Sequence, residues 1–166
     1  AYNLFYNHKK DCSGETIADG IAVKVPGIIA TPIIKKYVDD ILLVDELSIE
    51  DSISNLFEHE RVVSEGAGAT GIAAIYENKQ LFKNKNICTV ICGGNIDGRL
   101  FAGILNRKLS RDGRIARIRI DINDEPGMLA IIANTIANNG GNIIEIYHQE
   151  SILLYLFLIC ICSDTG

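Results

Sequence analysis

Long apolar runs, tryptophan and an excess of positive charge are all missing from this sequence. Its 166 residues include no tryptophan, one methionine and three prolines. The longest apolar run, Ile152 to Cys162, is much shorter than the roughly 20 residues of a membrane-spanning helix. The residues after Ala1 do not show the basic and then apolar segments of a signal peptide. We therefore expect no membrane partner.

Basic residues are too few to indicate a nucleic-acid-binding surface. The formal net charge is −5, with 16 lysines and arginines against 21 aspartates and glutamates. Proteins that bind nucleic acids usually carry a basic patch that neutralises phosphates. We therefore expect no nucleic-acid partner.

Cysteines with the spacing of a metal or redox site are also missing. The five cysteines form no C-x-x-C pair, and no histidines stand at zinc-like spacing from them. Cys88, Cys160 and Cys162 lie in apolar runs, where cysteine behaves as a small hydrophobic residue. The other two are Cys12 and Cys92. This usage predicts a protein of the reducing cytoplasm without a bound metal.

The composition is that of a globular protein. Hydrophobic residues make up 48% and charged residues 22%, which is enough apolar material for a core. Up to about residue 112, helix and strand patterns alternate, as in an α/β layer fold. From Arg114 the pattern changes to a strict alternation of polar and apolar residues. We therefore predict two domains, at residues 1–112 and 113–166.

The stretch 87–97 combines an apolar strand pattern with a glycine-rich turn. The charge-free residues 87–91 suit a strand that is buried on both faces of a parallel sheet. Cys92, Gly93 and Gly94 follow at the strand end, where parallel sheets bind ligands. Adjacent glycines let the backbone approach a flat or anionic group closely. An ordinary turn without a ligand has the same pattern, so both interpretations stay open.

Two shorter apolar runs, 21–25 and 41–44, predict further strands of this layer. Ser48 is expected to be the N-cap of the helix that follows. The helical spacing of its apolar residues predicts one buried face, formed by Ile49, Ile53, Leu56 and Phe57.

Gly66, Gly68 and Gly71 match the GxGxxG fingerprint of dinucleotide-binding folds. The next predicted strand, however, ends in Cys92 and lacks the carboxylate that would bind a ribose. The glycines therefore predict the tightly packed N-terminus of a helix. Two roles are open for Glu65, directly before that helix: it could act on a ligand in the crevice, or cap the helix from solvent.

The tail of the sequence has the pattern of a small sheet with one helix. Residues 114–122 alternate as a strand with one wet face does. A helix pattern follows the turn at 123–127, and Gly140 and Gly141 end it. Residues 142–148 and 152–162 predict a hairpin. The order strand, helix, strand, strand is the beginning of a ferredoxin-like unit.

Four stretches span nearly all of residues 1–110 in a fixed order: Glu15 to Lys24, Val38 to Ile41, Ser64 to Ala69 and Cys92 to Asp97. In order and spacing they resemble the pyridoxal-phosphate threonine dehydratases, also called threonine ammonia-lyases. The resemblance implies a fold-type II enzyme, a three-layer fold with a mostly parallel sheet, and pyridoxal 5′-phosphate as cofactor. It also implies deamination of threonine to 2-oxobutanoate, or of serine to pyruvate, with release of ammonia.

The tail resembles an ACT domain, a regulatory module of the βαββαβ type. The resemblance is carried by Asp124 to Leu129, Gly141 to Ile143, and Tyr147 with His148. It implies an incomplete ferredoxin-like domain, without the second helix and the last strand, that pairs with another copy. An amino-acid effector is expected near the turn formed by Asn123, Asp124 and Gly127. The sequence departs from the family pattern after His148, where Gln149 and Glu150 replace an acidic residue and an arginine.

The resemblance to threonine dehydratases also implies roles for single residues. At the position of Cys92 the family has a serine or cysteine, which meets the pyridine nitrogen of the cofactor. A thiol is a neutral partner, whereas an aspartate would keep that nitrogen protonated and strengthen the electron sink. Gly20 matches a small residue against the ring face, and Glu65 an acidic residue near the cofactor. Gly93 and Gly94 are expected to shape the wall of the site.

The lysine that forms the family's Schiff base has no counterpart here. None of the nine lysines stands in its motif; they are Lys9, Lys10, Lys24, Lys35, Lys36, Lys79, Lys83, Lys85 and Lys108. The family's phosphate-binding glycine loop and the asparagine facing the ring hydroxyl are not found either. We therefore expect a C-terminal fragment without catalytic residues, which is inactive alone.

Other functions stay open from the sequence. One is a non-catalytic amino-acid-sensing ACT module, and another is an enzyme similar to serine racemase; a dinucleotide-dependent oxidoreductase is disfavoured. The expected partners are an amino-acid substrate, an amino-acid effector and further copies of the chain, because exposed edge strands favour association. The sequence does not distinguish threonine from serine as substrate, nor a role in isoleucine biosynthesis from a catabolic one.

Overall fold

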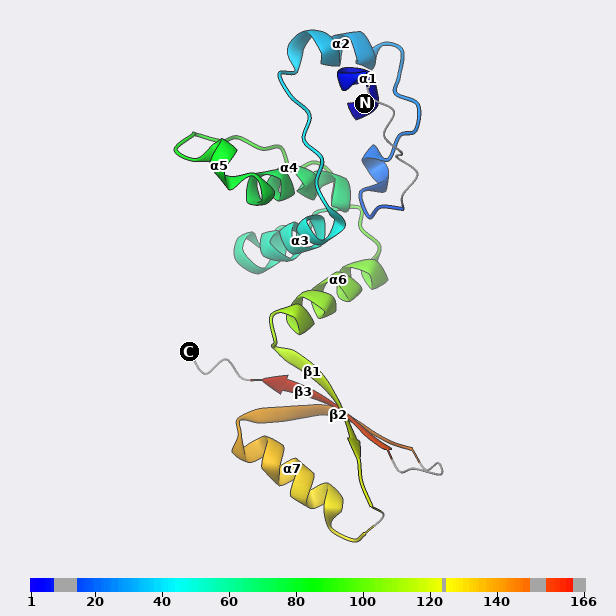
Figure 1. Ribbon diagram of the computed structural model, residues 1–166, viewed down its shortest axis with the longest axis vertical. Helices are drawn as coiled ribbons and strands as arrows, with labels where there is room; N and C mark the ends of the chain where they lie inside the picture. The colour runs from blue at the N-terminus through cyan, green and yellow to red at the C-terminus, as the bar shows by residue number, and fades with distance from the viewer. Residues whose placement is uncertain (8–14, 124, 150–154, 163–166) are drawn as a thin grey trace. The chain divides into compact units, whose positions relative to one another are not determined.

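The computed structural model describes residues 1–7, 15–123, 125–149 and 155–162 (Figure 1). The chain divides into two compact units, Ala1–Ile104 and Leu105–Gly166. The division falls inside helix α6 (Gly98–Arg111), and the boundary predicted from the sequence follows directly after this helix.

The first unit is built from helices joined by extended segments. Its elements are α1 (Tyr2–Tyr6), the 3-10 helix η1 (Asp19–Ile21), α2 (Ala30–Tyr37), α3 (Glu46–Glu60), α4 (Gly66–Glu77), α5 (Lys79–Phe82) and the first half of α6. The core lies where α3, α4 and α6 meet, and consists of Ala18, Ile49, Ile53, Leu56, Ala69, Ala73 and Ile104. The predicted apolar face of α3 is thereby confirmed, and its Phe57 packs edge-on against Phe101 of α6.

Helix α3 begins two residues before the predicted N-cap Ser48. Asp45 is the cap, and its carboxylate accepts a hydrogen bond of 2.7 Å from the backbone N–H of Ser48. Asp45 and Ser48 are both favourable cap residues, and the chain uses the earlier one because its side chain reaches the free N–H of the third helical residue. The prediction for Ser48 was therefore wrong.

The three segments predicted as strands in the first unit, 21–25, 41–44 and 87–91, are not part of a sheet in the described residues. A β-strand satisfies its backbone groups through a neighbouring strand, and none of these segments has one here. Residues 87–91 are consequently not buried on both faces: Ile87 is 45% and Val90 76% exposed. The mostly parallel sheet expected from the sequence is absent from the described part of this unit.

The second unit contains a three-stranded antiparallel sheet and one helix: β1 (Ile115–Asp121), α7 (Met128–Asn138), β2 (Gly141–Gln149) and β3 (Tyr155–Cys162). The strand order is β1-β3-β2, so β3 lies in the middle and the predicted hairpin of β2 with β3 is confirmed. β1 and β2 are parallel and separated by β3, which is the split βαβ arrangement of ferredoxin-like units. The register shifts between Ile143 and Glu145, which indicates a bulge in β2.

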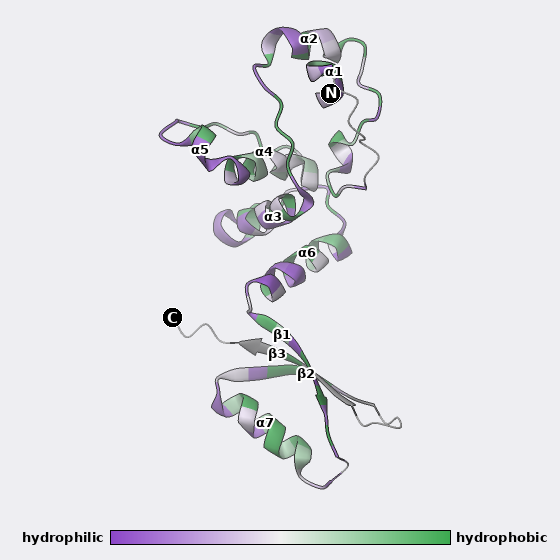
Figure 2. Ribbon diagram, in the orientation of Figure 1, coloured by the Kyte–Doolittle hydropathy of each residue, from purple (hydrophilic) through white to green (hydrophobic). Residues whose placement is uncertain are grey.

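Helix α7 packs on the sheet through apolar residues. Cys160 of β3 is buried, and Ile120, Ile122, Ile132, Ile136 and Ile143 surround it. Figure 2 shows the hydrophobic residues of α7 and the alternation of hydrophilic and hydrophobic residues along β1. The prediction that Cys160 acts as a small hydrophobic residue is confirmed, whereas Cys88 is exposed. In the described ranges, no helix has the length and apolarity needed to cross a membrane.

Candidate functional site

Two segments that lie far apart in the sequence meet the first turn of α4. The backbone of Ile17 and Ala18 packs against Gly66: a Cβ there would overlap the Ile17 carbonyl oxygen and lie 2.9 Å from the Ala18 nitrogen. The carbonyl of Cys92 packs against Gly68 in the same way, because a Cβ at this position would overlap the Cys92 oxygen. One helix end therefore holds both segments in place.

The GxGxxG match is explained by this packing. Gly71, the third glycine, lies against the side chain of Thr89, whose Oγ1 a Cβ would overlap. All three glycines are therefore in contact with other segments of the chain and give α4 a surface on which backbone can lie. The interpretation of these residues as a tightly packed helix N-terminus is confirmed.

Glu65 precedes α4, yet its side chain makes no capping hydrogen bond. Its carboxylate atoms lie 2.5 to 2.8 Å from the place of a Cβ at Gly93, and its Oε1 lies 3.4 Å from the place of one at Gly20. The backbone N–H of Glu65 donates to the Gly93 carbonyl at 3.2 Å. The alternative that Glu65 caps the helix is therefore wrong: its half-buried carboxylate faces Gly20 and Gly93.

Cys92, Gly93 and Gly94 form the turn that completes this group. Gly93 has a φ of +84°, a left-handed conformation that favours glycine, and any side chain would collide with Glu65. A Cβ at Gly94 would lie 3.1 Å from the Val63 carbonyl oxygen. The side chain of Cys92 is exposed, so its thiol is accessible while its carbonyl rests on α4.

The five site residues predicted in the first unit thus lie on three segments around one helix end. Gly20 and Gly93 carry no side chains, so backbone and the Glu65 carboxylate form the surface at this place. The polar groups here are the Cys92 thiol, the Glu65 carboxylate and the N–H groups of the first turn of α4, which have no partners within the helix. These groups can form hydrogen bonds to the edge of a ring and to a polar substituent, but none of them is an amine.

Two structural features of the site were not predicted. Ile17 and Ala18 contact α4 through backbone atoms, and the sequence gives no signal for a backbone contact. Asp97 accepts hydrogen bonds from the N–H groups of Arg99 and Leu100 at 2.9 and 3.0 Å and so caps α6. An aspartate before a helical apolar pattern was a detectable signal for the second feature.

The predicted effector residues lie at the turn between β1 and α7. Asn123 is exposed, and its carbonyl accepts a hydrogen bond of 2.9 Å from the N–H of Glu125. Gly127 has a φ of +94° and open space around its Cα. Asp124 lies outside the described residues. A cavity of about 550 Å³ in the same unit is lined by other residues, among them Arg117 and Glu145.

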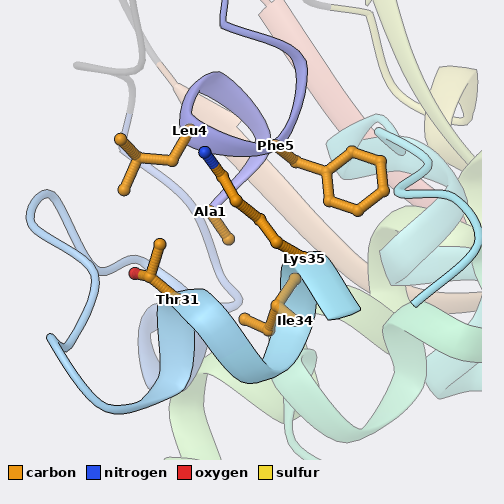
Figure 3. Close-up of a pocket in the computed structure, with 6 residues that line it drawn as sticks. All are labelled: Ala1, Leu4, Phe5, Thr31, Ile34 and Lys35. Carbon is orange, nitrogen blue, oxygen red and sulfur yellow. The ribbon is translucent and has the colours of Figure 1, made fainter. Parts of the chain in front are cut away.

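Two cavities of the first unit are lined by residues other than the predicted site residues, and the larger one is lined by Ala18, Ile21 and Ala22, on either side of Gly20. Figure 3 shows one between α1 and α2, lined by Ala1, Leu4, Phe5, Thr31, Ile34 and Lys35. Its volume of about 10 Å³ has room for one water molecule at most. A mostly apolar groove of about 540 Å³ runs between residues 41–44 and α4.

Comparison with known proteins identifies the class to which this site belongs. A family model described as "Pyridoxal-phosphate dependent enzyme" matches residues 2–93, which include Gly20, Glu65, Cys92 and Gly93. The chain therefore belongs to the pyridoxal-phosphate-dependent enzymes, and its fold class is α/β.

Two curated relatives are L-threonine ammonia-lyases. The L-threonine ammonia-lyase of Thermotoga maritima is 43% identical over 136 residues, which are 82% of this chain and 34% of that protein. The L-threonine ammonia-lyase of Geobacter sulfurreducens is 40% identical over 81% of this chain and 34% of its own length. The chain thus spans about a third of the length of these relatives.

Among solved structures, the chain is similar to serine racemase from Dictyostelium discoideum. The identity is 33%, the match covers 57% of this chain and 31% of that one, and the TM-score is 0.49.

Proposed function

We propose that the first unit forms part of the cofactor site of a threonine ammonia-lyase, which converts threonine or serine to the 2-oxo acid and ammonia. The observation that carries this proposal is that the Glu65 carboxylate lies against Gly93 and near Gly20, in a turn that begins with the exposed Cys92. These residues come from three separate motifs of the family. The L-threonine ammonia-lyases that match most of this chain support the choice of activity.

The residues present fit pyridoxal phosphate by their chemistry. Gly20 and Gly93 present backbone beside the Glu65 carboxylate, and an added Cβ at Gly93 would collide with that carboxylate. When bound, the cofactor supplies an electron sink for removal of the α-proton and loss of the β-hydroxyl. Cys92 would be the partner of its ring nitrogen, Gly20 and Gly93 would present backbone to the ring, and Glu65 would place a carboxylate at one edge.

The first experiment asks whether the sequence of this chain can complete a working site. The matching 136 residues of the Thermotoga maritima protein are replaced by those of this chain, and release of 2-oxobutanoate from threonine is measured. We expect activity that depends on pyridoxal phosphate. A well-folded chimaera that binds the cofactor and does not deaminate threonine or serine would contradict the proposal.

Two variants of Cys92 in this chimaera test its role. Cys92→Ser keeps a neutral hydrogen-bonding group and should retain most of the activity. Cys92→Asp places a second carboxylate beside Glu65, where two like charges disfavour each other, and it favours a protonated ring nitrogen. We expect an activity loss of roughly 100-fold, because a correctly placed proton donor or acceptor contributes a factor of about this size. Equal activity of both variants would refute the assignment of Cys92.

We also propose that the chain is inactive alone, because none of its nine lysines stands in the family's lysine motif. The purified chain is incubated with pyridoxal phosphate and threonine, and 2-oxobutanoate is measured. No product above the level without protein is expected. Product that disappears on substitution of one particular lysine would refute this part and identify the lysine.

For the second unit we propose an ACT-type regulatory tail that pairs between copies of a cytoplasmic homo-oligomer. The supporting observation is the split βαβ sheet with α7 on one face. This observation also supports the second candidate function, an amino-acid-sensing module. Calorimetric titration with isoleucine, valine and threonine tests for an effector site at Asn123 and Gly127. No heat with any of them would contradict effector binding, and a monomer at all concentrations would contradict pairing.

A further inference from the structure

We propose that Gly68 is a positioning residue for Cys92: the lack of a side chain at position 68 fixes where the thiol stands. The inference rests on the proposed function only for the identity of the ligand that contacts the thiol. The effect of residue 68 on the position of the thiol does not depend on that function. Gly68 is buried in the first turn of α4, three positions after Glu65. It therefore connects the two polar groups of the candidate site.

The contact at Gly68 is made with backbone, which leaves little room for adjustment. A Cβ at this position would overlap the Cys92 carbonyl oxygen, lie 2.6 Å from Ser64 Oγ and 3.2 Å from the Cys92 carbonyl carbon. Ser64 is fully buried and donates from Oγ to the Glu65 carbonyl at 2.9 Å, so it does not move freely. An added methyl group must therefore displace the Cys92 peptide.

Displacement of this peptide would reach the rest of the site. The next residue, Gly93, is tied to Glu65 by the N–H to carbonyl hydrogen bond of 3.2 Å and by contact with the carboxylate. The Cys92 side chain is exposed, whereas its carbonyl is packed against Gly68 of α4. The position of the thiol relative to Glu65 thus depends on a closely packed residue 68.

Gly71 provides a graded comparison on the same helix. A Cβ there would overlap Thr89 Oγ1 but would lie 3.5 Å from Thr89 Cβ, so rotation of one side chain relieves most of the conflict. Gly98, the first residue of α6, has no atoms within 4 Å of an added Cβ. The three glycines therefore predict a decreasing series of disturbance at Cys92: Gly68, then Gly71, then Gly98.

The test is alkylation of the full chain with N-ethylmaleimide, with the rate at each cysteine read by mass spectrometry of its peptide. Cys88 is exposed and lies four residues before Cys92, so it reports general loosening of the same segment. We expect Gly68→Ala to raise the rate at Cys92 several-fold relative to Cys88. Gly98→Ala should leave the ratio unchanged. An unchanged ratio in a folded Gly68→Ala chain would overturn the proposal.

Gly71→Ala keeps the test decisive if Gly68→Ala does not fold, as judged by circular dichroism. It should raise the Cys92 to Cys88 ratio by less, and Thr89→Ala in the same chain should restore the original ratio. A parallel rise at both cysteines would indicate a merely structural role and would overturn the proposal.

A second arm separates this inference from the proposed function. Pyridoxine 5′-phosphate has the ring and phosphate of the cofactor but no aldehyde, so it cannot react with lysines. In the chimaera with the Thermotoga maritima protein, which adds the parts of that protein that this chain does not cover, it should slow alkylation of Cys92, and less so when Gly68→Ala is also present. If it has no effect on Cys92 while Gly68→Ala still changes the ratio, the positioning role stands and the cofactor contact fails.

Discussion

The two units of this chain contain equally strong strand patterns but differ in whether the strands form. In Leu105–Gly166, all three predicted strands pair, with β3 bonded on both sides. In Ala1–Ile104, the runs 41–44 and 87–92 are at least as apolar, but neither joins a sheet in the described residues. In the second unit, each strand has its pairing partner within a few dozen residues of the chain. In the first unit, the described residues provide no pairing partner for the predicted strands. An apolar β-prone run therefore predicts a strand only where its partner is available.

The turn of the candidate site lies in the unit whose apolar runs do not pair. The contacts of Cys92 and Gly93 come from the N-terminus of α4 and from Glu65, and none of them needs a sheet. Residues 87–91 before them are exposed or half-buried. The local geometry of the turn is thus set by packing against a helix. The segment that leads into the turn forms no strand-to-strand hydrogen bonds in the described residues.

The largest difference between the units should appear when a proline replaces one residue of each apolar run. Leu158→Pro removes a backbone N–H from the middle of β3, the central strand, and should cost about 3 kcal/mol or more. Val90→Pro lies in a run without a described ladder and should cost about 0.5 kcal/mol. Hydrogen exchange read by mass spectrometry measures both, unit by unit. Similar losses from the two substitutions would refute the comparison.

A substitution in the core of the first unit should destabilise that unit and leave the second unit unchanged. Ile53 is fully buried where α3 meets α4, and Ile53→Ala should lower the free energy of unfolding by roughly 2 to 5 kcal/mol. Leu47→Ala on the same helix is the control, because Leu47 is 58% exposed and should change it by about 0.5 kcal/mol.

Urea unfolding followed by circular dichroism gives these free energies, and hydrogen exchange locates the effect. Faster exchange is expected in α3 and α4, with no change in the strands of the second unit. An Ile53→Ala effect no larger than that of Leu47→Ala would mean that this cluster is not a stabilising core.

A smaller effect is expected at the cap of α6. Asp97→Ala removes the acceptor for the N–H groups of Arg99 and Leu100 and should cost about 1 kcal/mol. Asp97→Asn retains a capping oxygen and should cost clearly less. Helix content by circular dichroism and exchange of residues 98–104 measure the change. Equal effects of the two variants would show that charge, and not capping, is what Asp97 supplies.

Much of the second unit was predictable because its signals are local. The alternation in residues 114–122, the glycines after α7 and the short link between the last two strands each act over a few residues. The strand order β1-β3-β2 then follows from a hairpin and a crossover helix. The bulge at Ile143 to Glu145 was missed, since a bulge depends on cross-strand packing.

The candidate site was predictable as a set of residues, but its contacts were not. The motifs indicated that Gly20, Glu65 and Cys92 belong together. The capping role held open for Glu65 was wrong because helix propensity rules describe an isolated helix end, and here Gly93 contributes a surface next to the carboxylate. Burial of 87–91 was also predicted wrongly, since burial depends on neighbours that a single run does not specify.

The smallest effect concerns a single ionisation on the sheet of the second unit. The hydroxyl of Tyr147 donates to Glu145 Oε2 at 2.8 Å, and this hydrogen bond, together with the negative charge of Glu145, raises the pKa of Tyr147 above 10.0. Because the folded pKa is the higher one, the contact stabilises the fold below pH 10 and is lost as the pH rises through the raised pKa. The effect is small because Tyr147 lies at the surface.

Two substitutions should move this pKa in opposite directions. Glu145→Gln keeps an acceptor but removes the charge, so the pKa of Tyr147 should fall towards 10.0. Arg117→Gln removes a positive charge that lowers it, so the pKa should rise further. Tyrosinate absorbance, taken as the difference from a Tyr147→Phe chain, measures both, with Glu125→Gln as an exposed carboxylate control. Arg117 of β1 and Glu145 of β2 both pair with Ile159 of β3. Shifts of the same sign in the two variants would show that this register does not hold the two side chains on one face of the sheet.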